Sequence, residues 1–272
     1  MKKRFIGREN ELKELNGRYE SGRKEFGVIY GRRRIGKSAL ISHFLEDKNG
    51  ILFQAKKDNA YGNLRSFSYE LNKLLKLPRG FVFSAWEQAF DALLEYAGNE
   101  RFVVAIDEYP YIVEQDGSFP SVLQEFIDRA NENLFFLISG SDISLLKKEI
   151  RDHASPLYKR RTFEMAVAQM PYREALEFLE GFSNEIKCNY LALMSTYPYY
   201  LSAINKNLSF EENVRQLLFN QYGTFFTLPD QLLSNATKVQ DVYNAILTAI
   251  AHRRRTNKEI ADYIHEEETK VA

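Results

Sequence analysis

Residues 31–38 of the sequence read GRRRIGKS and match G-x-x-x-x-G-K-S, the pattern of loops that bind nucleotide phosphates. Glycines allow a tight turn in which successive N–H groups surround a phosphate, and the helix that follows adds its own free N–H groups. In this pattern Lys37 reaches the β- and γ-phosphates, and the Ser38 hydroxyl is a ligand of Mg²⁺. The predicted nucleotide-binding residues are Gly31, Arg32, Arg33, Arg34, Ile35, Gly36, Lys37, Ser38 and Ala39. The alternative interpretation is a basic, glycine-containing turn without a ligand.

Two adjacent carboxylates follow an apolar run in residues 101–108, which read RFVVAIDE. An uninterrupted apolar run is typical of a strand buried on both faces of a parallel sheet, and open α/β proteins bind ligands where such strands end. Carboxylates there are costly unless they serve something charged. Asp107 is placed to hold Mg²⁺ through water, and Glu108 to polarise the water that attacks the γ-phosphate. A solvated acidic turn is the alternative.

Small hydroxyl side chains and two arginines add further candidates. Residues 134–141, LFFLISGS, read as a buried strand that ends at Ser139 and Ser141, whose hydroxyls could bind the γ-phosphate or the attacking water. Serine is also common at strand ends. Arg160 and Arg161 follow a polar stretch and precede another strand; an arginine here could stabilise charge that develops during phosphoryl transfer, and a surface basic turn explains them equally well.

Strands and helices must position these residues. The phosphate loop joins a strand at 26–30 to a helical pattern at 39–45. Further strands are predicted at 51–55 and 162–167, and amphipathic helices at 64–77, 84–98 and 118–131. The apolar stripes of these helices, which include Phe67, Leu71, Trp86, Phe90 and Leu93, are read as core.

From Pro171 onward the sequence predicts helices only, at 172–181, 185–196, 198–205 and 210–222. Residues 228–230 read as a linker, followed by helices at 239–252 and 256–264 with the basic turn RRR between them. Thr256 can cap the second helix together with Glu259 in a capping box. This pair is typical of the opening of a helix-turn-helix module.

Composition excludes several classes of protein. Lys plus Arg and Asp plus Glu number 37 each, so net charge favours neither a nucleic acid nor a membrane as partner. The single cysteine, Cys188, excludes an internal disulfide and a cysteine-rich zinc site. Neither a signal peptide nor an apolar run of transmembrane length is present, so a cytoplasmic protein is expected.

The ordered set of motifs resembles the archaeal and bacterial ATPase family within the AAA+-like, STAND-related branch of P-loop NTPases. The matching pieces are 5–9 (FIGRE), 30–38 (YGRRRIGKS), 106–108 (IDE), 140–141 (GS), 155–160 (SPLYKR) and 197–201 (YPYYL). Two positions depart from the family pattern: Lys159 stands where a glycine is usual before the arginine, and Ser195-Thr-Tyr stands where Gly-Gly usually precedes the lid proline, here Pro198.

The resemblance implies an α/β P-loop NTPase fold, with a five-stranded parallel sheet in the order 5-1-4-3-2, a helical lid and the start of a winged helix. The domains implied are an ATPase core at 1–168, a lid at 169–227 and a partial winged helix at 228–272. The resemblance also implies that Ile6, Gly7 and Arg8 lie near the adenine. Ser141, rather than Ser139, is expected to act as the polar residue that senses the γ-phosphate.

The expected function is that of a Mg²⁺-dependent ATPase that binds ATP and acts as a conformational switch. Lys37, Glu108, Ser141 and Arg160 are the predicted catalytic residues, and Ser38 and Asp107 the predicted metal ligands. A nucleotide-locked scaffold or a DNA-binding regulator without turnover is the first alternative. A small-molecule kinase is the second, although no acceptor site is marked.

The last residues are expected to stop inside a domain. Residues 266–269 read as a turn with Thr269 as N-cap, and 270–272 as the start of a third helix. Without that helix Val242, Ile246 and Ile250 would lack a cover unless they pack on the ATPase core. Specific DNA binding should be weak or absent. The expected partners are ATP or ADP, an unidentified protein client, and DNA through a complete winged helix in a longer product, with no membrane partner.

Overall fold

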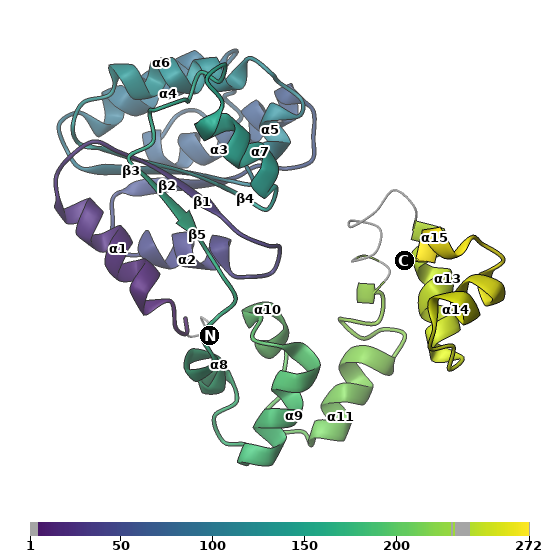
Figure 1. Ribbon diagram of the computed structural model, residues 1–272. Coiled ribbons are helices and arrows are strands. Elements are labelled where there is room, and N and C mark those ends of the chain that lie inside the picture. Colours follow the sequence, from purple (N-terminus) through teal and green to yellow (C-terminus); the bar gives the residue numbers. More distant parts are fainter. Residues whose placement is uncertain (1–4, 230, 232–239, 272) are drawn as a thin grey trace. The chain divides into compact units, whose positions relative to one another are not determined.

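The computed structural model of the chain describes residues 5–229, 231 and 240–271 (Figure 1). The chain forms two compact units, Met1–Ser202 and Ala203–Ala272, and each is described separately.

A five-stranded sheet forms the centre of the first unit. Its strands are β1 (Glu25–Tyr30), β2 (Gly50–Gln54), β3 (Phe102–Asp107), β4 (Leu134–Gly140) and β5 (Phe163–Ala166). All pairings are parallel and the order is β2-β3-β4-β1-β5. Read from the other edge, this is the predicted order 5-1-4-3-2, which is therefore confirmed, as is the α/β class.

Burial along the strands follows their places in the sheet. Every residue of β1, β3 and β4 is buried, whereas the edge strands β2 and β5 alternate between buried and more exposed positions. A central strand has neighbours on both sides and helices on both faces, so it is apolar throughout. The carboxyl ends of β1, β3 and β4 lie together, since Tyr30 pairs with Gly140 and Ile106 with Ile138.

Helices cover both faces of the sheet (Figure 1). One face packs against α1 (Glu9–Glu20) and α2 (Lys37–Phe44) through a cluster that includes Leu15, Leu40 and Phe135. The other face packs against α3 (Ala60–Leu75), α4 (Trp86–Ala97), α6 (Phe119–Arg129) and α7 (Ile143–Arg151).

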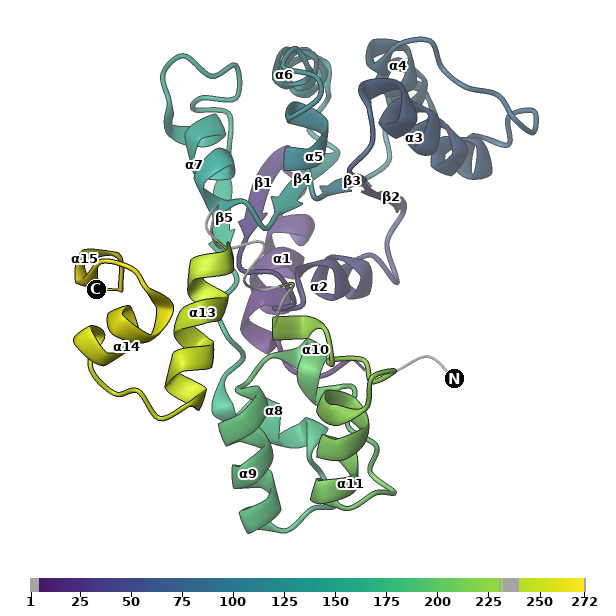
Figure 2. The same cartoon turned by 90° about the vertical axis from the view of Figure 1, so that its right-hand side faces the viewer.

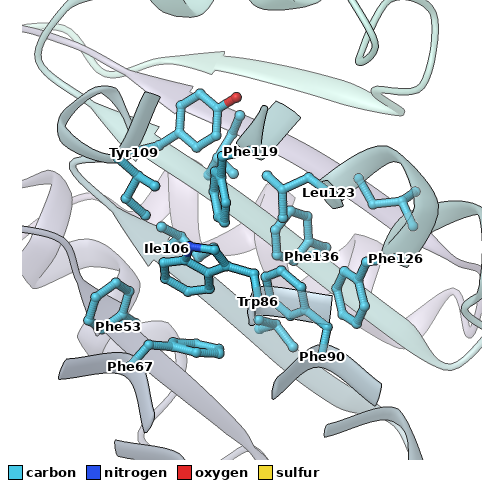
Figure 3. Close-up of a cluster of buried hydrophobic side chains, with 14 of the residues drawn as sticks. Phe53, Phe67, Trp86, Phe90, Ile106, Tyr109, Phe119, Leu123, Phe126 and Phe136 are labelled. Carbon is cyan, nitrogen blue, oxygen red and sulfur yellow. The ribbon is translucent and has the colours of Figure 1, made fainter. Parts of the chain in front are cut away.

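Aromatic side chains fill the second face (Figure 3). Trp86 lies at their centre, with its ring centroid 4.7 Å from that of Phe119 and 5.2 Å from that of Phe67. Phe90 stacks on Phe126 at 4.5 Å. The predicted core positions on α3 and α4 are thus confirmed, because Phe67, Leu71, Trp86, Phe90 and Leu93 are all buried.

The helices that follow β3 and β4 were not predicted. The segment after β4 reads as polar, yet α7 buries Leu146 and Ile150 one turn apart, and its N-terminus is capped by the Asp142 side chain, which accepts from Leu145 N–H. The other is α5 (Pro110–Val113), a single turn directly after Glu108. A single turn such as α5 is too short to show a periodicity, whereas α7 has apolar residues at helical spacing that the prediction did not use.

The helices at the end of the first unit are α8 (Tyr172–Phe178), α9 (Asn184–Met194) and α10 (Pro198–Leu201). They lie where the sequence predicts helices, but α8 and α10 end three or more residues earlier than predicted. Gly181, in the left-handed region with φ 97°, lies between α8 and α9. Pro198 occupies the first turn of α10, where its missing N–H costs nothing.

The second unit contains α11 (Phe210–Val214), the π-helical turn η1 (Arg215–Phe219), α13 (Gln240–Ala251), α14 (Asn257–Ile264) and α15 (Glu268–Val271). The helix predicted at 210–222 ends early, at the π-helical turn. The predicted linker falls partly on residues outside the described ones, and Leu228 and Pro229 are helical.

The capping box at the start of α14 is confirmed, because Thr256 accepts from Glu259 N–H and the Glu259 carboxylate accepts from Thr256 N–H. The predicted cap at Thr269 is wrong, since α15 already begins at Glu268. Ile250 on α13 is half exposed within this unit. In the part of the chain that the structure describes, none of the helices combines the length and apolar character needed to cross a bilayer.

Candidate functional site

The loop at residues 31–38 connects β1 to α2 at the carboxyl edge of the sheet. Gly36 is the residue before α2 and has φ 98°, a conformation that residues with a side chain rarely adopt. A Cβ on Gly31 would lie 2.5 Å from the Val167 carbonyl oxygen, so only glycine fits beside the chain that leaves β5. The glycines of the motif are therefore required by backbone geometry.

Lys37 is almost fully buried at the start of α2. Its ammonium donates to the carbonyl oxygens of Gly31 (2.9 Å) and Arg32 (3.2 Å), so the side chain folds back over the loop. Burial lowers the pKa of Lys37, while the nearby carboxylates of Glu108 and Asp107 act in the opposite direction. The cation is thus held inside the loop, next to two carboxylates.

Asp107, the last residue of β3, is buried and accepts hydrogen bonds from two hydroxyls. Ser38 donates to one carboxylate oxygen and Ser139 to the other. This set of hydroxyl and carboxylate oxygens suits Mg²⁺, a hard cation that keeps several water ligands and is completed by phosphate oxygens. Among the described residues there is no cluster of three or more His, Cys, Asp or Glu that could hold a metal.

Glu108 turns out of the strand direction. Its φ of 53° lies in the left-handed region, and its N–H donates to Asp107 Oδ1 at 3.0 Å. One oxygen of its carboxylate, Oε2, accepts from the Ser141 hydroxyl (3.1 Å) and more weakly from Ser141 N–H (3.3 Å). Arg33 in turn lies 3.4 Å from the Ser141 hydroxyl and donates to the Tyr111 hydroxyl at 2.9 Å. Ser141 therefore holds this carboxylate directly, and Arg33 holds Ser141 in turn.

A cavity of about 750 Å³ opens above the loop within the first unit, a size typical of ligand sites. Its polar wall includes Lys37, Ser38 and Glu108, and its apolar wall includes Ile6 and Phe178. The other residues around it are Phe5, Arg8, Arg33, Arg34, Ile35, Gly36, Ala39, Ser42, His43, Glu46, Gln54, Ala55, Tyr111, Met170, Pro198, Tyr199 and Ser202. Most predicted nucleotide-binding residues thus line one cavity.

Arg8 has a structural role that the sequence does not reveal. Its buried guanidinium donates to the carbonyl oxygens of Ile35 (2.9 Å) and Ala168 (2.8 Å), and its N–H donates to the Glu174 carboxylate at 2.7 Å. Gly7 has φ 69°, a conformation that favours glycine, and a Cβ there would also displace the Glu174 carboxylate from this contact, at 2.3 Å from Oε2. Arg8 therefore ties the N-terminal segment to the phosphate loop and to α8.

Some predicted site residues lie elsewhere. Gly31 and Arg32 line a second cavity, of about 420 Å³, on the side of the loop that faces Val167 and Lys147. Arg160 donates through two nitrogens to the Asp128 carboxylate (2.9 and 2.8 Å) and through a third to the Pro156 carbonyl. It precedes β5, and in a parallel sheet the residues before a strand lie at the edge opposite the phosphate loop. The structure therefore does not bring Arg160 to the cavity of its own chain.

Several contacts around the cavity were not predicted, although Arg34 and Phe5 themselves lie in predicted motifs. Arg34 lies over the ring of Tyr199 (5.0 Å to the centroid) and within 3.4 Å of the Tyr200 hydroxyl. Phe5 stacks on His43 with ring centroids 4.3 Å apart. Tyr199 and Tyr200 belong to the YPYYL piece of the family resemblance, but nothing in the sequence indicates that they contact Arg34.

Comparison with known families identifies the chain. Residues 5–191 match the model of an ATPase domain found predominantly in Archaea. The chain belongs to this family. A separate affiliation with the STAND branch stays a prediction.

Curated relatives come from Methanocaldococcus jannaschii. An uncharacterised protein is 27% identical over 267 residues, which are 96% of this chain and 57% of the relative. A second uncharacterised protein is 25% identical over 88% of this chain and 45% of its own length. This chain thus spans about half the length of these two relatives. An uncharacterised ATP-binding protein is 41% identical over 44 residues, 16% of this chain and 75% of the relative.

Solved structures with a similar fold come from Aeropyrum pernix. The ORC1 protein in complex with DNA has a TM-score of 0.59 and 12% identity, covering 98% of this chain and 81% of that one. The ORC2 protein in ADPNP–ADP complexes has a TM-score of 0.53 and 15% identity, covering 94% and 77%. At these identities the likeness supports the fold alone.

Proposed function

We propose that the chain binds ATP and hydrolyses it with the help of Mg²⁺, and that hydrolysis acts as a conformational switch. The observation that carries this proposal is the meeting of Lys37, Ser38, Asp107 and Glu108 beside one cavity at the carboxyl edge of the sheet. Membership of an ATPase domain family supports it. So does the A. pernix ORC2 protein, which has a similar fold and was solved in ADPNP–ADP complexes.

The loop and Lys37 would hold the phosphates. Free N–H groups at the start of α2 and in the loop favour negative charge there. Lys37 would exchange its two carbonyl acceptors for phosphate oxygens, which are stronger acceptors for an ammonium. The base would lie against the apolar wall that includes Ile6 and Phe178.

Ser38 and Asp107 would hold Mg²⁺, the serine directly and the aspartate through water. When bound, the metal would neutralise charge on the β- and γ-phosphates. The two hydroxyls that already contact Asp107 keep its carboxylate oriented toward the loop.

Glu108 would act as the general base. Its carboxylate would orient a water molecule toward the γ-phosphate and take up the proton that this water loses. Ser141 holds one carboxylate oxygen, Oε2, so the other oxygen is the one that would accept the water. Ser141 is a positioning residue in this scheme, and it would also sense the γ-phosphate through its hydroxyl.

Helix α10 would change its position when the bound nucleotide changes from ATP to ADP. Arg34 of the loop contacts Tyr199 and Tyr200 on α10, and a Cβ on Gly36 would lie 3.7 Å from the Pro198 ring. A change in the loop on loss of the γ-phosphate would therefore reach α10 through Arg34. We further propose the division into core (1–168), lid (169–227) and winged-helix segment (228–272), with DNA as a partner of the last. The A. pernix ORC1 protein, which has a similar fold, was solved in complex with DNA.

Release of inorganic phosphate from ATP, measured without any added acceptor, tests this function. We expect release with Mg²⁺ and none with excess EDTA, because Ser38 and Asp107 require the metal to act on the phosphates. Tight nucleotide binding without release would instead indicate a nucleotide-locked scaffold. Phosphate transfer that requires an added small-molecule acceptor would indicate a kinase.

A second chain could supply a further guanidinium to the cavity. Arg160 and Arg161 lie before β5, away from the cavity of their own chain, and an arginine supplied in trans can raise turnover strongly. Specific ATPase activity should then rise with protein concentration, and Arg160→Ala or Arg161→Ala should remove this dependence. Arg129→Ala, at another surface ion pair, is the matched control. Constant specific activity from dilute to concentrated wild-type protein would contradict assembly through these residues.

A further inference from the structure

The outer face of α3 carries alternating aromatic and basic side chains. Tyr61, Arg65, Tyr69 and Lys73 follow one another at intervals of four residues, and all four are exposed. Residues four apart on a helix lie on the same side, about 6 Å apart along the axis. Tyr61 exposes 60% and Tyr69 44% of its surface, so both rings are accessible to a ligand.

The loop after α3 extends this face. Lys76, Arg79 and Phe81 are all exposed, Phe81 by 41%. A cleft of about 530 Å³ lies between the end of the helix and the loop, lined by Tyr69, Asn72, Lys73, Leu77, Arg79 and Gly80. Its walls therefore combine a ring face, an apolar side chain and two cations.

Charge is distributed unevenly around this face. Residues 56–79 contain six Lys or Arg against two Asp or Glu, although the whole chain balances at 37 each. Glu70 pairs with Lys73 at 2.8 Å, whereas Arg65, Lys76 and Arg79 form no ion pair within the described part of the chain. The neighbouring α4, which lies beside α3 in Figure 2, carries the exposed acidic side chains Glu87 and Glu95 instead. The positive charge is thus confined to the α3 side.

The inner face of α3 makes its outer face rigid. Leu64, Phe67 and Leu71 are buried in the aromatic core. At the start of the helix the buried Asn63 side chain exchanges two hydrogen bonds with the Lys56 backbone, at 2.9 and 3.0 Å. The backbone of a helix that is already fixed loses no further conformational freedom when its side chains bind a ligand.

We propose that the outer face of α3 and the following loop, through Tyr61, Arg65, Tyr69, Lys73 and Arg79, bind a single strand of nucleic acid. The bases would stack on the tyrosine rings and enter the cleft beside Tyr69, and the phosphates would pair with Arg65, Lys73 and Arg79. Alternating rings and cations match the alternating bases and phosphates of an unpaired strand, whereas a duplex hides its base faces. This site is separate from the nucleotide cavity and does not depend on ATP hydrolysis.

Fluorescence anisotropy of labelled oligonucleotides tests the proposal directly. Oligo-dT and oligo-rU of about 20 nucleotides, longer than the usual site on one binding surface, distinguish DNA from RNA. We expect binding at about 50 mM salt that weakens as salt rises, and weaker binding of a blunt duplex of equal length. Absence of single-strand binding at this salt, or equal affinity for the duplex, would overturn the proposal.

Variants separate stacking from charge. The double variant Tyr61→Ala, Tyr69→Ala should weaken binding by about tenfold or more. The double variant Tyr61→Phe, Tyr69→Phe should bind as the wild type does, because the rings remain. Binding weakens with salt, and each phosphate contact adds about 0.7 to the steepness of the plot of log K against log salt. The double variant Arg65→Gln, Arg79→Gln should therefore reduce this slope by about 1.4.

Exposed residues elsewhere in the first unit supply the controls. Tyr172→Ala and Lys13→Gln should leave the affinity unchanged. If the phenylalanine double variant lost as much affinity for the single strand as the alanine double variant, stacking of bases on these rings would be contradicted. Complete displacement of the strand by polyglutamate at an equal charge concentration would also overturn the proposal and assign the face to an acidic protein segment.

Discussion

Replacing Glu108 by glutamine is expected to lower the rate of ATP hydrolysis about 100-fold or more, which is the usual contribution of a positioned general base. Glutamine keeps the size of the side chain and can still accept from the Ser141 hydroxyl, which lies 3.1 Å from the Glu108 carboxylate. It cannot take the proton that the attacking water loses. Nucleotide affinity should therefore change little, while the rate of phosphate release falls.

Single-turnover phosphate release and a binding titration with a fluorescent ATP analogue measure the two effects separately. Glu114→Gln is the matched control, because Glu114 is exposed just after the short helix α5 and outside the cavity. A Glu108→Gln protein that hydrolyses ATP at the wild-type rate would remove Glu108 from the mechanism.

Replacing Lys37 by alanine is expected to weaken ATP binding by about 10- to 100-fold, because hydrogen bonds to charged groups stabilise by about 1.5–3 kcal/mol. The side chain is buried and donates to the Gly31 and Arg32 carbonyls of its own loop, so its removal takes away the cation that the loop encloses. Burial already lowers the pKa of Lys37, so the charge is maintained at a cost that bound phosphate would offset.

Isothermal titration with ATP and with ADP checks the loss of affinity. ATP should lose more affinity than ADP, because Lys37 is expected to reach the γ-phosphate as well as the β-phosphate. Lys13→Ala, an exposed change on α1, should bind as the wild type does. Unchanged ATP affinity in Lys37→Ala, with an intact circular dichroism spectrum, would contradict the assigned role of the loop.

Much of the fold could be predicted because its signals are local. Uninterrupted apolar runs such as 102–106 and 134–138 identify buried parallel strands, and G-x-x-x-x-G-K-S needs no partner outside its own loop to be recognised. The strand order came from the family resemblance rather than from any run of residues. The helices α5 and α7 were missed: α5 because a single turn shows no periodicity, and α7 although its apolar residues recur at helical spacing.

The arrangement of the site depended on contacts between segments far apart in the chain. Ser141 reaches Glu108 because β3 and β4 are neighbours in register, and Arg8 reaches Ala168, 160 residues away, because the N-terminal segment crosses the end of β5. The parallel pairing of β5 with β1 places Arg160, which precedes β5, at the opposite edge, next to Asp128.

The sequence by itself thus determined which residues can carry phosphate chemistry, because residue type and spacing define the loop and the paired carboxylates. Only the tertiary structure decided which of them meet, because strand register and helix packing set distances that no local pattern encodes. Lys37, Ser38, Asp107, Glu108 and Ser141 meet at one edge of the sheet, and Arg160 does not join them.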